Sequence, residues 1–149
     1  DKFNIIRLTY PLELNLSEIR QLDNPGNEMI AYGKIPMMVS AQCLKKTAKG
    51  CDHKKEILVL KDRKNSEMQV KTHCDFCYNT ILNSKPLSIL GMENEVKKIS
   101  PGILRLWFTT ENASETKTVL RKYIDNFYNN VTVSNIDDFT RGHLKRGIE

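Results

Sequence analysis

The sequence predicts a mixed α and β fold, in which short strands form a mixed sheet and a few helices pack beside it. Short β-branched runs recur along the chain, and each is bounded by proline, glycine or asparagine. Two segments carry capping residues ahead of apolar residues at helical spacing. Hydrophobic residues make up 40% of the 149 residues and charged residues 28%, a balance typical of a soluble globular protein rather than a disordered chain.

The first forty residues are expected to form a strand, a helix and two further strands. Phe3–Tyr10 is apolar and β-branched, and Pro11 ends it. Asn15 and the glutamate three residues later resemble a capping box for a short helix at Leu16–Leu22. Two short buried strands follow, EMIAYG and IPMMVS. This order indicates a βαβ unit.

The middle of the chain is predicted to hold a loop and a hairpin. The segment from Cys43 to Cys51 is expected to be loop. Strands at Ile57–Leu60 and Met68–Thr72 are separated by a polar turn at Asp62–Glu67. The returning strand leads to a Cys-x-x-Cys pair, after which the chain continues as extended pieces.

The last third is predicted to form a helix, a strand and a longer helix. Met92–Ile99 is a short helix ended by the sequence SPG. The run GILRLWFTTE is a strand with alternate apolar residues on one face. Asn112 and Glu115 are placed to cap the longest helix. Its apolar stripe comprises Val119, Leu120, Tyr123, Ile124, Phe127 and Tyr128.

The chain is predicted to be one fragment of a longer protein, organised as a strand–helix–strand region at 1–40, a four-cysteine segment at 41–90 and a strand–helix–tail region at 101–149. It begins without methionine, carries no signal peptide, and has no apolar run near the ~18 residues of a membrane helix. Residues 41–64 hold eight Lys or Arg and three Asp or Glu, which accounts for the net charge of +5. Either this loop contacts an anion through Lys45, Lys46 and Lys49, or its charges are simply solvated.

The four cysteines carry the most specific chemical signal. Their pattern is Cys43-x7-Cys51-x22-Cys74-x2-Cys77. A closed hairpin brings Cys51 and Cys74 together at its base, so one four-sulfur metal site is predicted. Disulfides and a thioredoxin-like Cys-x-x-Cys are the alternatives, but nothing indicates secretion and the following residues are β-rich. The x7 spacing departs from zinc fingers and favours an iron–sulfur cluster over zinc.

At these residues the chain resembles a known family. The segments are EMIAYGKIPMMVSAQC, CDFCYNTILNSKPLSIL, LRLWFTTENASET and FTRGHLKRGIE. They are similar to the C-terminal part of the collagenase-like peptidases, peptidase family U-thirty-two. The resemblance extends from Ile6 to Glu149, and its most specific parts are Glu28–Gln42, the cysteines and Phe139–Glu149.

The resemblance implies one of two activities, peptide hydrolysis or support of a hydroxylation reaction. Family members are described as proteases, some acting on collagen, whereas others support hydroxylation of RNA bases or quinone precursors and hold an iron–sulfur cluster on four cysteines. Carried over, the ligands are Cys43, Cys51, Cys74 and Cys77. The family fold is barrel-like, and 3–40 would supply its last strands. The implied partners are the N-terminal part of the same protein and an RNA or peptide substrate. A cytoplasmic location without a membrane partner is expected from the lack of any sign of secretion and of a membrane-length apolar run.

The sequence gives the protease label little independent support. Ser40 and His143 are present, yet nothing arranges them as nucleophile and base, and no His-Glu-x-x-His motif occurs. The catalytic residues are therefore unknown. In the terminal segment, Arg141, Lys145 and Arg146 are candidate anion contacts beside glycines, or solvated charges of a packed tail. RNA modification, peptide hydrolysis and a non-catalytic zinc module that binds nucleic acid or a partner all remain open.

Overall fold

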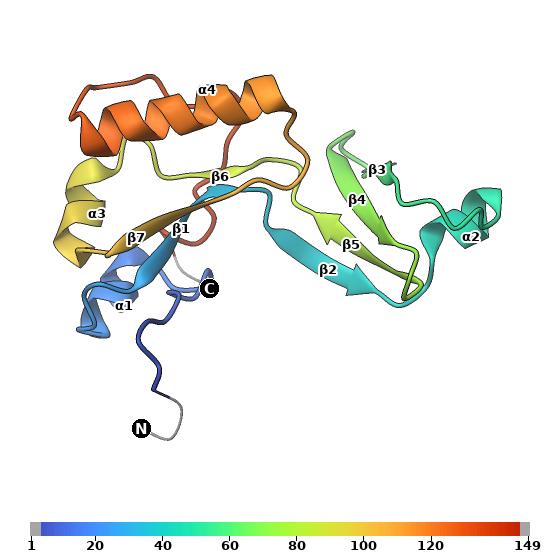
Figure 1. The fold of residues 1–149 in the computed structure, drawn as a ribbon, viewed down its shortest axis with the longest axis horizontal. Helices are drawn as coiled ribbons and strands as arrows, with labels where there is room; N and C mark the ends of the chain where they lie inside the picture. The colour runs from blue at the N-terminus through green and yellow to red at the C-terminus, as the bar shows by residue number, and fades with distance from the viewer. Residues whose placement is uncertain (1–3, 147–149) are drawn as a thin grey trace. The chain divides into compact units, whose positions relative to one another are not determined.

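A computed structural model describes residues 4–146, with the backbone alone at Lys49. The described chain is mixed α and β, as predicted, and contains two separate sheets (Figure 1). It divides into two compact units, which differ from the three predicted regions. The cysteine unit is residues 34–86, and the split unit is formed by residues 4–33 together with 87–146. No helix in the described part is long and apolar enough to cross a bilayer.

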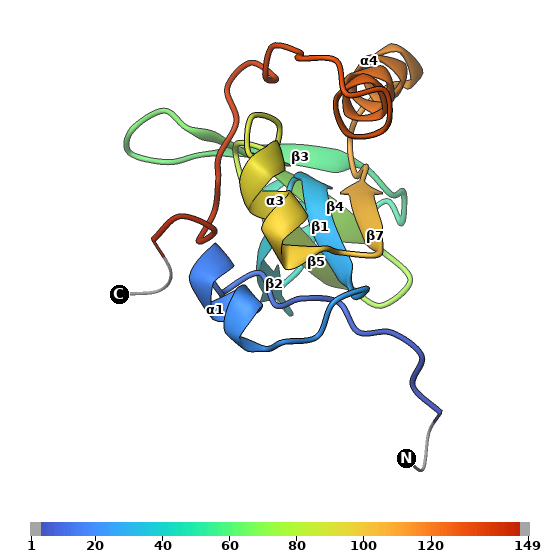
Figure 2. The ribbon, with the colours of Figure 1, turned by 90° about the vertical axis from the view of Figure 1, so that its left-hand side faces the viewer.

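The split unit is built on a three-stranded sheet of order β6-β1-β7. β1 (Glu28–Gly33) is central, runs parallel to β7 (Ile103–Trp107) and antiparallel to β6 (Leu87–Ser88). Almost all of β1 is buried, as expected for a strand paired on both edges. Two short helices, α1 (Leu16–Gln21) and α3 (Glu93–Ile99), pack against each other in this unit (Figure 2).

Both predicted capping boxes are present. Asn15 accepts hydrogen bonds from the first turn of α1, and Glu18 accepts one from the Asn15 backbone at 2.7 Å. Asn112 and Glu115 do the same for α4 (Ala113–Tyr123). These side chains satisfy backbone N–H groups that have no partner inside the helix. The predicted helix at Met92–Ile99 is also confirmed as α3.

The predicted strand at Phe3–Tyr10 is wrong for the residues that are described. Phe3 itself lies outside them. Between Asn4 and Tyr10 only Thr9 forms a bridge, parallel to Glu28 at the start of β1. The segment has no partner strand along the rest of its length, and Ile6 is 94% exposed. The expected βαβ unit is reduced to this single bridge, and no closed barrel forms within 4–146.

The apolar stripe predicted for the longest helix is only partly buried. Val119 and Tyr123 are buried, whereas Leu120 and Ile124 are each 44% exposed and Tyr128 is 83% exposed. The helix changes at its end to a π-helical segment, η1 (Ile124–Tyr128). A π turn widens the helix and rotates the residues that follow it, so the stripe does not continue along one face.

The cysteine unit is a four-stranded antiparallel sheet of order β2-β5-β4-β3. Its strands are β2 (Pro36–Ser40), β3 (Ile57–Lys61), β4 (Glu67–His73) and β5 (Tyr78–Leu82). The predicted hairpin is confirmed as β3 and β4. Asp62 shapes its turn, because Oδ1 accepts hydrogen bonds from the backbone N–H groups of Lys64 and Ser66.

The segment predicted as loop between Cys43 and Cys51 instead contains a helix, α2 (Leu44–Lys49). Cys43 occupies its N-cap position, and its sulfur accepts a hydrogen bond from the Lys46 backbone. Cysteine is not among the usual capping residues, which is why the sequence pattern did not predict this helix.

Candidate metal centre

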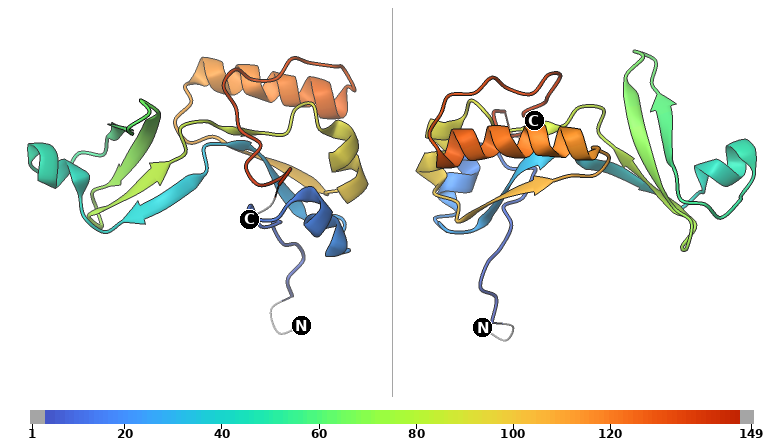
Figure 3. Two further views of the ribbon diagram at one scale, coloured as in Figure 1. Left: turned by 180° about the vertical axis from the view of Figure 1, so that it is seen from behind. Right: turned by 45° about the horizontal axis from the view of Figure 1, so that its top comes forward.

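All four cysteine-bearing segments lie at one end of the sheet in the cysteine unit. β2 leads toward Cys43, and β4 leads directly into Cys74. β5 begins directly after Cys77, and β3 begins shortly after Cys51. Because neighbouring strands of this sheet are antiparallel, the ends of β2 and β4 coincide with the beginnings of β5 and β3 (Figure 3). The topology therefore gathers residues that are up to 34 positions apart in the sequence.

Cys74 and Cys77 belong to one tight turn. The four-residue connection between β4 and β5 starts and ends with them, and His73 and Tyr78 are the register partners that close it. The Phe76 N–H donates to the His73 carbonyl at 3.1 Å. Cys77 has a φ of 53°, a conformation uncommon for a residue with a side chain and often kept for a functional reason.

The segment after Cys51 runs beside Cys74. The Cys74 thiol donates a hydrogen bond to the Lys54 carbonyl at 3.1 Å. One step further along, the backbone N–H of Thr72 donates to the Glu56 carbonyl at 3.1 Å. Cys51 lies only three residues before Lys54, so the structure supports the predicted proximity of these two cysteine-bearing segments at the base of the hairpin.

The buried side chain of Lys45 joins α2 to the segment that follows Cys51. Its side chain is 4% exposed, forms ion pairs with Asp52 and with Glu56, and donates to the Lys54 carbonyl at 2.9 Å. The hydrogen bond from Lys45 lowers the pKa of Asp52 to about 2. The Lys54 carbonyl thus accepts from both Lys45 and Cys74. The charge of Lys45 is engaged inside the unit, and the residue does not offer it to an external anion.

The first cysteine is tied to the turn of the last two through β2 and β5. The side-chain amide of Asn79, two residues after Cys77, donates to the Gln42 carbonyl at 2.7 Å. Gln42 directly precedes Cys43, and the Cys43 sulfur lies 3.4 Å from the Lys46 nitrogen.

The side chains of these cysteines do not form a coordination sphere in the structure. Within residues 4–146, no three His, Cys, Asp or Glu side chains are placed to hold one metal ion. Cys51 and Cys77 are exposed, Cys43 is half-buried and Cys74 is buried. The gathering of the segments agrees with the prediction, whereas coordination by all four sulfurs remains a proposal.

The flanking histidine His73 is already engaged. Its ring stacks on Tyr78 with centroids 4.2 Å apart, and Nε2 lies 3.1 Å from the Thr80 hydroxyl. Asp75, in the turn, pairs with Lys55 at 2.5 Å. These contacts give both residues a structural role that needs no metal.

The other predicted anion contacts differ in availability. The Arg141 guanidinium donates to the Ser88 carbonyl at 2.6 Å and lies 4.6 Å from the centre of the Phe139 ring. Burial lowers the pKa of the Arg141 guanidinium. Its contacts hold the C-terminal segment against β6, so its role here is structural. Lys145, Arg146 and Lys46 are exposed. The side chain of Lys49 lies outside the described part.

The two residues considered for hydrolysis, Ser40 and His143, belong to different units. Ser40 belongs to the cysteine unit, where its hydroxyl donates to the Gln42 carbonyl at 3.2 Å. His143 belongs to the split unit.

Sequence reasoning missed a second buried polar arrangement, in the split unit. The Tyr32 hydroxyl donates to Glu111 Oε1 at 2.9 Å, while Glu111 Oε2 accepts from the backbone of Thr109 and Thr110. Burial raises the pKa of Tyr32. The position of Glu111 just before a helix N-cap was the only signal available. On the same strand as Tyr32, Glu28 pairs with Arg105 at 2.9 Å.

Comparisons with known proteins leave the geometry as the main guide to function. No family model, curated protein or solved structure matches the chain.

Proposed function

We propose that the cysteine unit is a metal-binding module in which Cys43, Cys51, Cys74 and Cys77 hold one centre. The single observation that carries this proposal is the sheet topology. The four strand ends that are connected to the cysteine-bearing segments all lie at the same end of the sheet. We favour an iron–sulfur cluster, with zinc as the alternative, because the x7 spacing of the first pair departs from zinc fingers.

A set of four cysteine ligands suits both zinc and an iron–sulfur cluster. Four thiols become four thiolates on binding, a set that suits zinc and iron–sulfur clusters alike. Cys74 would then give up its proton and its hydrogen bond to the Lys54 carbonyl. Cys51 and Cys77 are exposed, so both side chains would have to turn toward Cys74 to join it at one centre. Lys45 would keep α2 against the segment that carries Cys51, so its role is positioning.

The small core of the unit supports a structural contribution from the metal. Among its described side chains, the buried apolar ones are Val70, Cys74, Ile81 and Leu82. Met37, Met38 and Val39 are each more than half exposed. A unit of this size with so little buried apolar surface commonly needs a metal to stay folded. This observation favours zinc as a staple, the second candidate function.

Within the first candidate, the chain is the cluster-bearing C-terminal region of an enzyme that resembles the collagenase-like peptidases and acts in hydroxylation of RNA bases. A bound cluster supplies electron transfer or substrate activation. The four cysteines of this chain would hold the cluster on their thiolates, the burial of Cys74 would keep water from it, and the exposed Lys46 would be available to an anionic substrate. Peptide hydrolysis has no residue arrangement in the described units that favours it.

Metal content of the full chain, prepared without oxygen, tests the proposal. Iron and acid-labile sulfide with a brown colour support the cluster, whereas one equivalent of zinc in a colourless protein supports the staple. Each of the four Cys→Ser variants should lose most of the metal. His53→Gln and His73→Gln are the matched controls beside the cysteines and should retain it. Full metal retention in any cysteine variant contradicts a four-sulfur site.

Binding of a single-stranded RNA oligonucleotide tests the substrate class separately. Lys46→Gln should reduce the salt dependence of binding by about one counterion. Lys117→Gln, an exposed lysine on α4, is the control and should leave it unchanged. Equal effects of the two variants contradict a contact at Lys46, and leave the metal result unaffected.

A further inference from the structure

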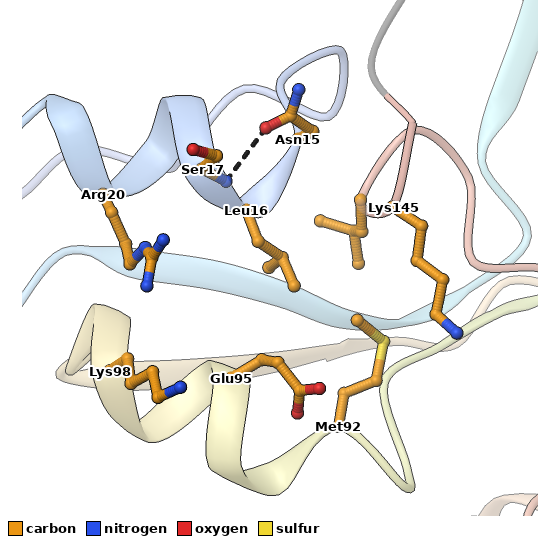
Figure 4. Close-up of a pocket in the computed structure, with 9 residues that line it drawn as sticks. Asn15, Leu16, Ser17, Arg20, Met92, Glu95, Lys98 and Lys145 are labelled. Carbon is orange, nitrogen blue, oxygen red and sulfur yellow. Dashed lines mark hydrogen bonds between the residues drawn. The ribbon is translucent and has the colours of Figure 1, made fainter.

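A pocket in the split unit lies between α1, α3 and the turn near the end of the described chain. Its volume is about 370 Å³, within the range of small-ligand sites. Leu16, Met92 and Leu144 contribute apolar side chains to it, and the last two are almost fully buried. The Leu16 backbone N–H donates to the Leu144 carbonyl at 3.0 Å, which fixes α1 against the turn. Figure 4 shows the lining side chains.

Positive charge surrounds this apolar floor. Arg20 comes from α1, Lys98 from α3 and Lys145 from the turn, and Glu95 is the one carboxylate in the lining. Figure 4 shows Arg20 pointing from α1 toward the space between the two helices, and Lys98 on the facing helix, with its side chain running along α3 toward Glu95. No ion pair within the described chain involves either of them. Like charges placed in this way repel, and a bound anion relieves the repulsion.

We propose that this pocket binds a phosphate group carried on an apolar or aromatic body, a chemistry for which a mononucleotide is the probe. A phosphate presents several charged acceptor oxygens and can accept from Arg20 and Lys98 together. Ser17 also lines the pocket. The apolar floor of Met92 and Leu144 receives the body of the ligand. A carboxylate ligand has fewer oxygens with which to span two walls.

Substitution of both the positive and the negative residues of the lining makes a sharper test than loss of binding alone. Arg20→Gln and Lys98→Gln each remove one favourable charge and should weaken binding of adenosine monophosphate by about tenfold. Glu95→Gln removes a repulsive charge from the same lining and should strengthen it. Lys117→Gln, exposed on α4 and outside the pocket, should change nothing. A general loss of folding cannot produce both signs.

The experiment is a calorimetric titration of the full chain and these variants, with thermal unfolding as the check on folding. Adenosine monophosphate should bind more tightly than adenosine or inorganic phosphate. Equal binding of adenosine overturns the phosphate contact, and equal binding of inorganic phosphate overturns the role of the floor. Absence of binding at millimolar concentration, or weaker binding in Glu95→Gln, overturns the proposal. The cysteine unit is untouched, so the metal proposal stands or fails separately.

Discussion

The Tyr32 hydroxyl donates a hydrogen bond to Glu111 Oε1 across 2.9 Å, which joins the central strand of the split unit to the loop that begins α4. The same carboxylate accepts from two backbone N–H groups of that loop. Burial alone would raise the pKa of Glu111, but the hydrogen bonds from Thr109, Thr110 and Tyr32 outweigh it and the pKa is lowered.

Replacement of Glu111 by glutamine should therefore destabilise the protein in a pH-dependent way. A lowered folded pKa means that the contribution is present above the ordinary value of 4.5 and is lost as pH falls through the folded value. At pH 7 the cost should be about 1–3 kcal/mol. Urea unfolding across pH 3 to 7 measures it, with exposed Glu13→Gln as the control. A difference that does not shrink in acid contradicts the assignment.

Gly33 should not tolerate a side chain. It has a φ of 141°, and an added Cβ would clash with the Trp107 carbonyl oxygen and lie 2.9 Å from the Trp107 Cβ. Gly33→Ala combines this overlap with backbone strain, so we expect a loss of about 2–4 kcal/mol in the free energy of unfolding. Gly26 has a φ of 83° and nothing within 4 Å, so Gly26→Ala should cost only about 1 kcal/mol. Similar costs for the two variants would contradict the close approach.

The helices with local signals could be predicted from the sequence. The capping residues Asn15 and Asn112 act within one turn, so their meaning does not depend on the rest of the fold. The β3–β4 hairpin was predictable for the same reason, since its turn chemistry at Asp62 is local. The predictions failed where the outcome depends on distant partners. Residues 4–10 are β-prone, yet Thr9 is the one residue among them that forms a β-bridge to another segment.

The candidate site was predictable only in part. Hairpin closure predicts from the pattern alone that the segments carrying Cys51 and Cys74 meet, and the β3–β4 pairing agrees with this. The pairing of β2 with β5, which brings the Cys43 segment to the same end, was not predicted. The burial of Lys45 was not predictable. A lysine-rich segment is usually solvated, and only the fold shows that Asp52 and Glu56 converge on this one amine.

Removal of the buried Tyr123 hydroxyl alone, with the ring kept in place, should destabilise the fold. It donates to the Ala31 carbonyl at 2.7 Å and lies 3.2 Å from the Ile89 nitrogen and the Ser88 hydroxyl. Tyr123→Phe leaves these groups without their partner, at an expected cost of about 1–3 kcal/mol in chemical unfolding. Tyr128 is 83% exposed, so Tyr128→Phe is the matched control and should be neutral. Equal stability of Tyr123→Phe and the wild type would show that the network is dispensable.

Thiol reactivity should follow the exposure of each cysteine in metal-free protein. Cys51 and Cys77 are exposed, whereas Cys74 is 9% exposed and its thiol donates a hydrogen bond to the Lys54 carbonyl. Iodoacetamide should therefore modify Cys74 about tenfold more slowly, because local opening must precede attack. Addition of the metal should slow all four reactions together, since each thiolate becomes a ligand. Peptide mass spectrometry resolves the sites. Protection of only Cys74 and Cys77 would mean that the turn binds metal without the first pair, and the four-sulfur centre would be wrong.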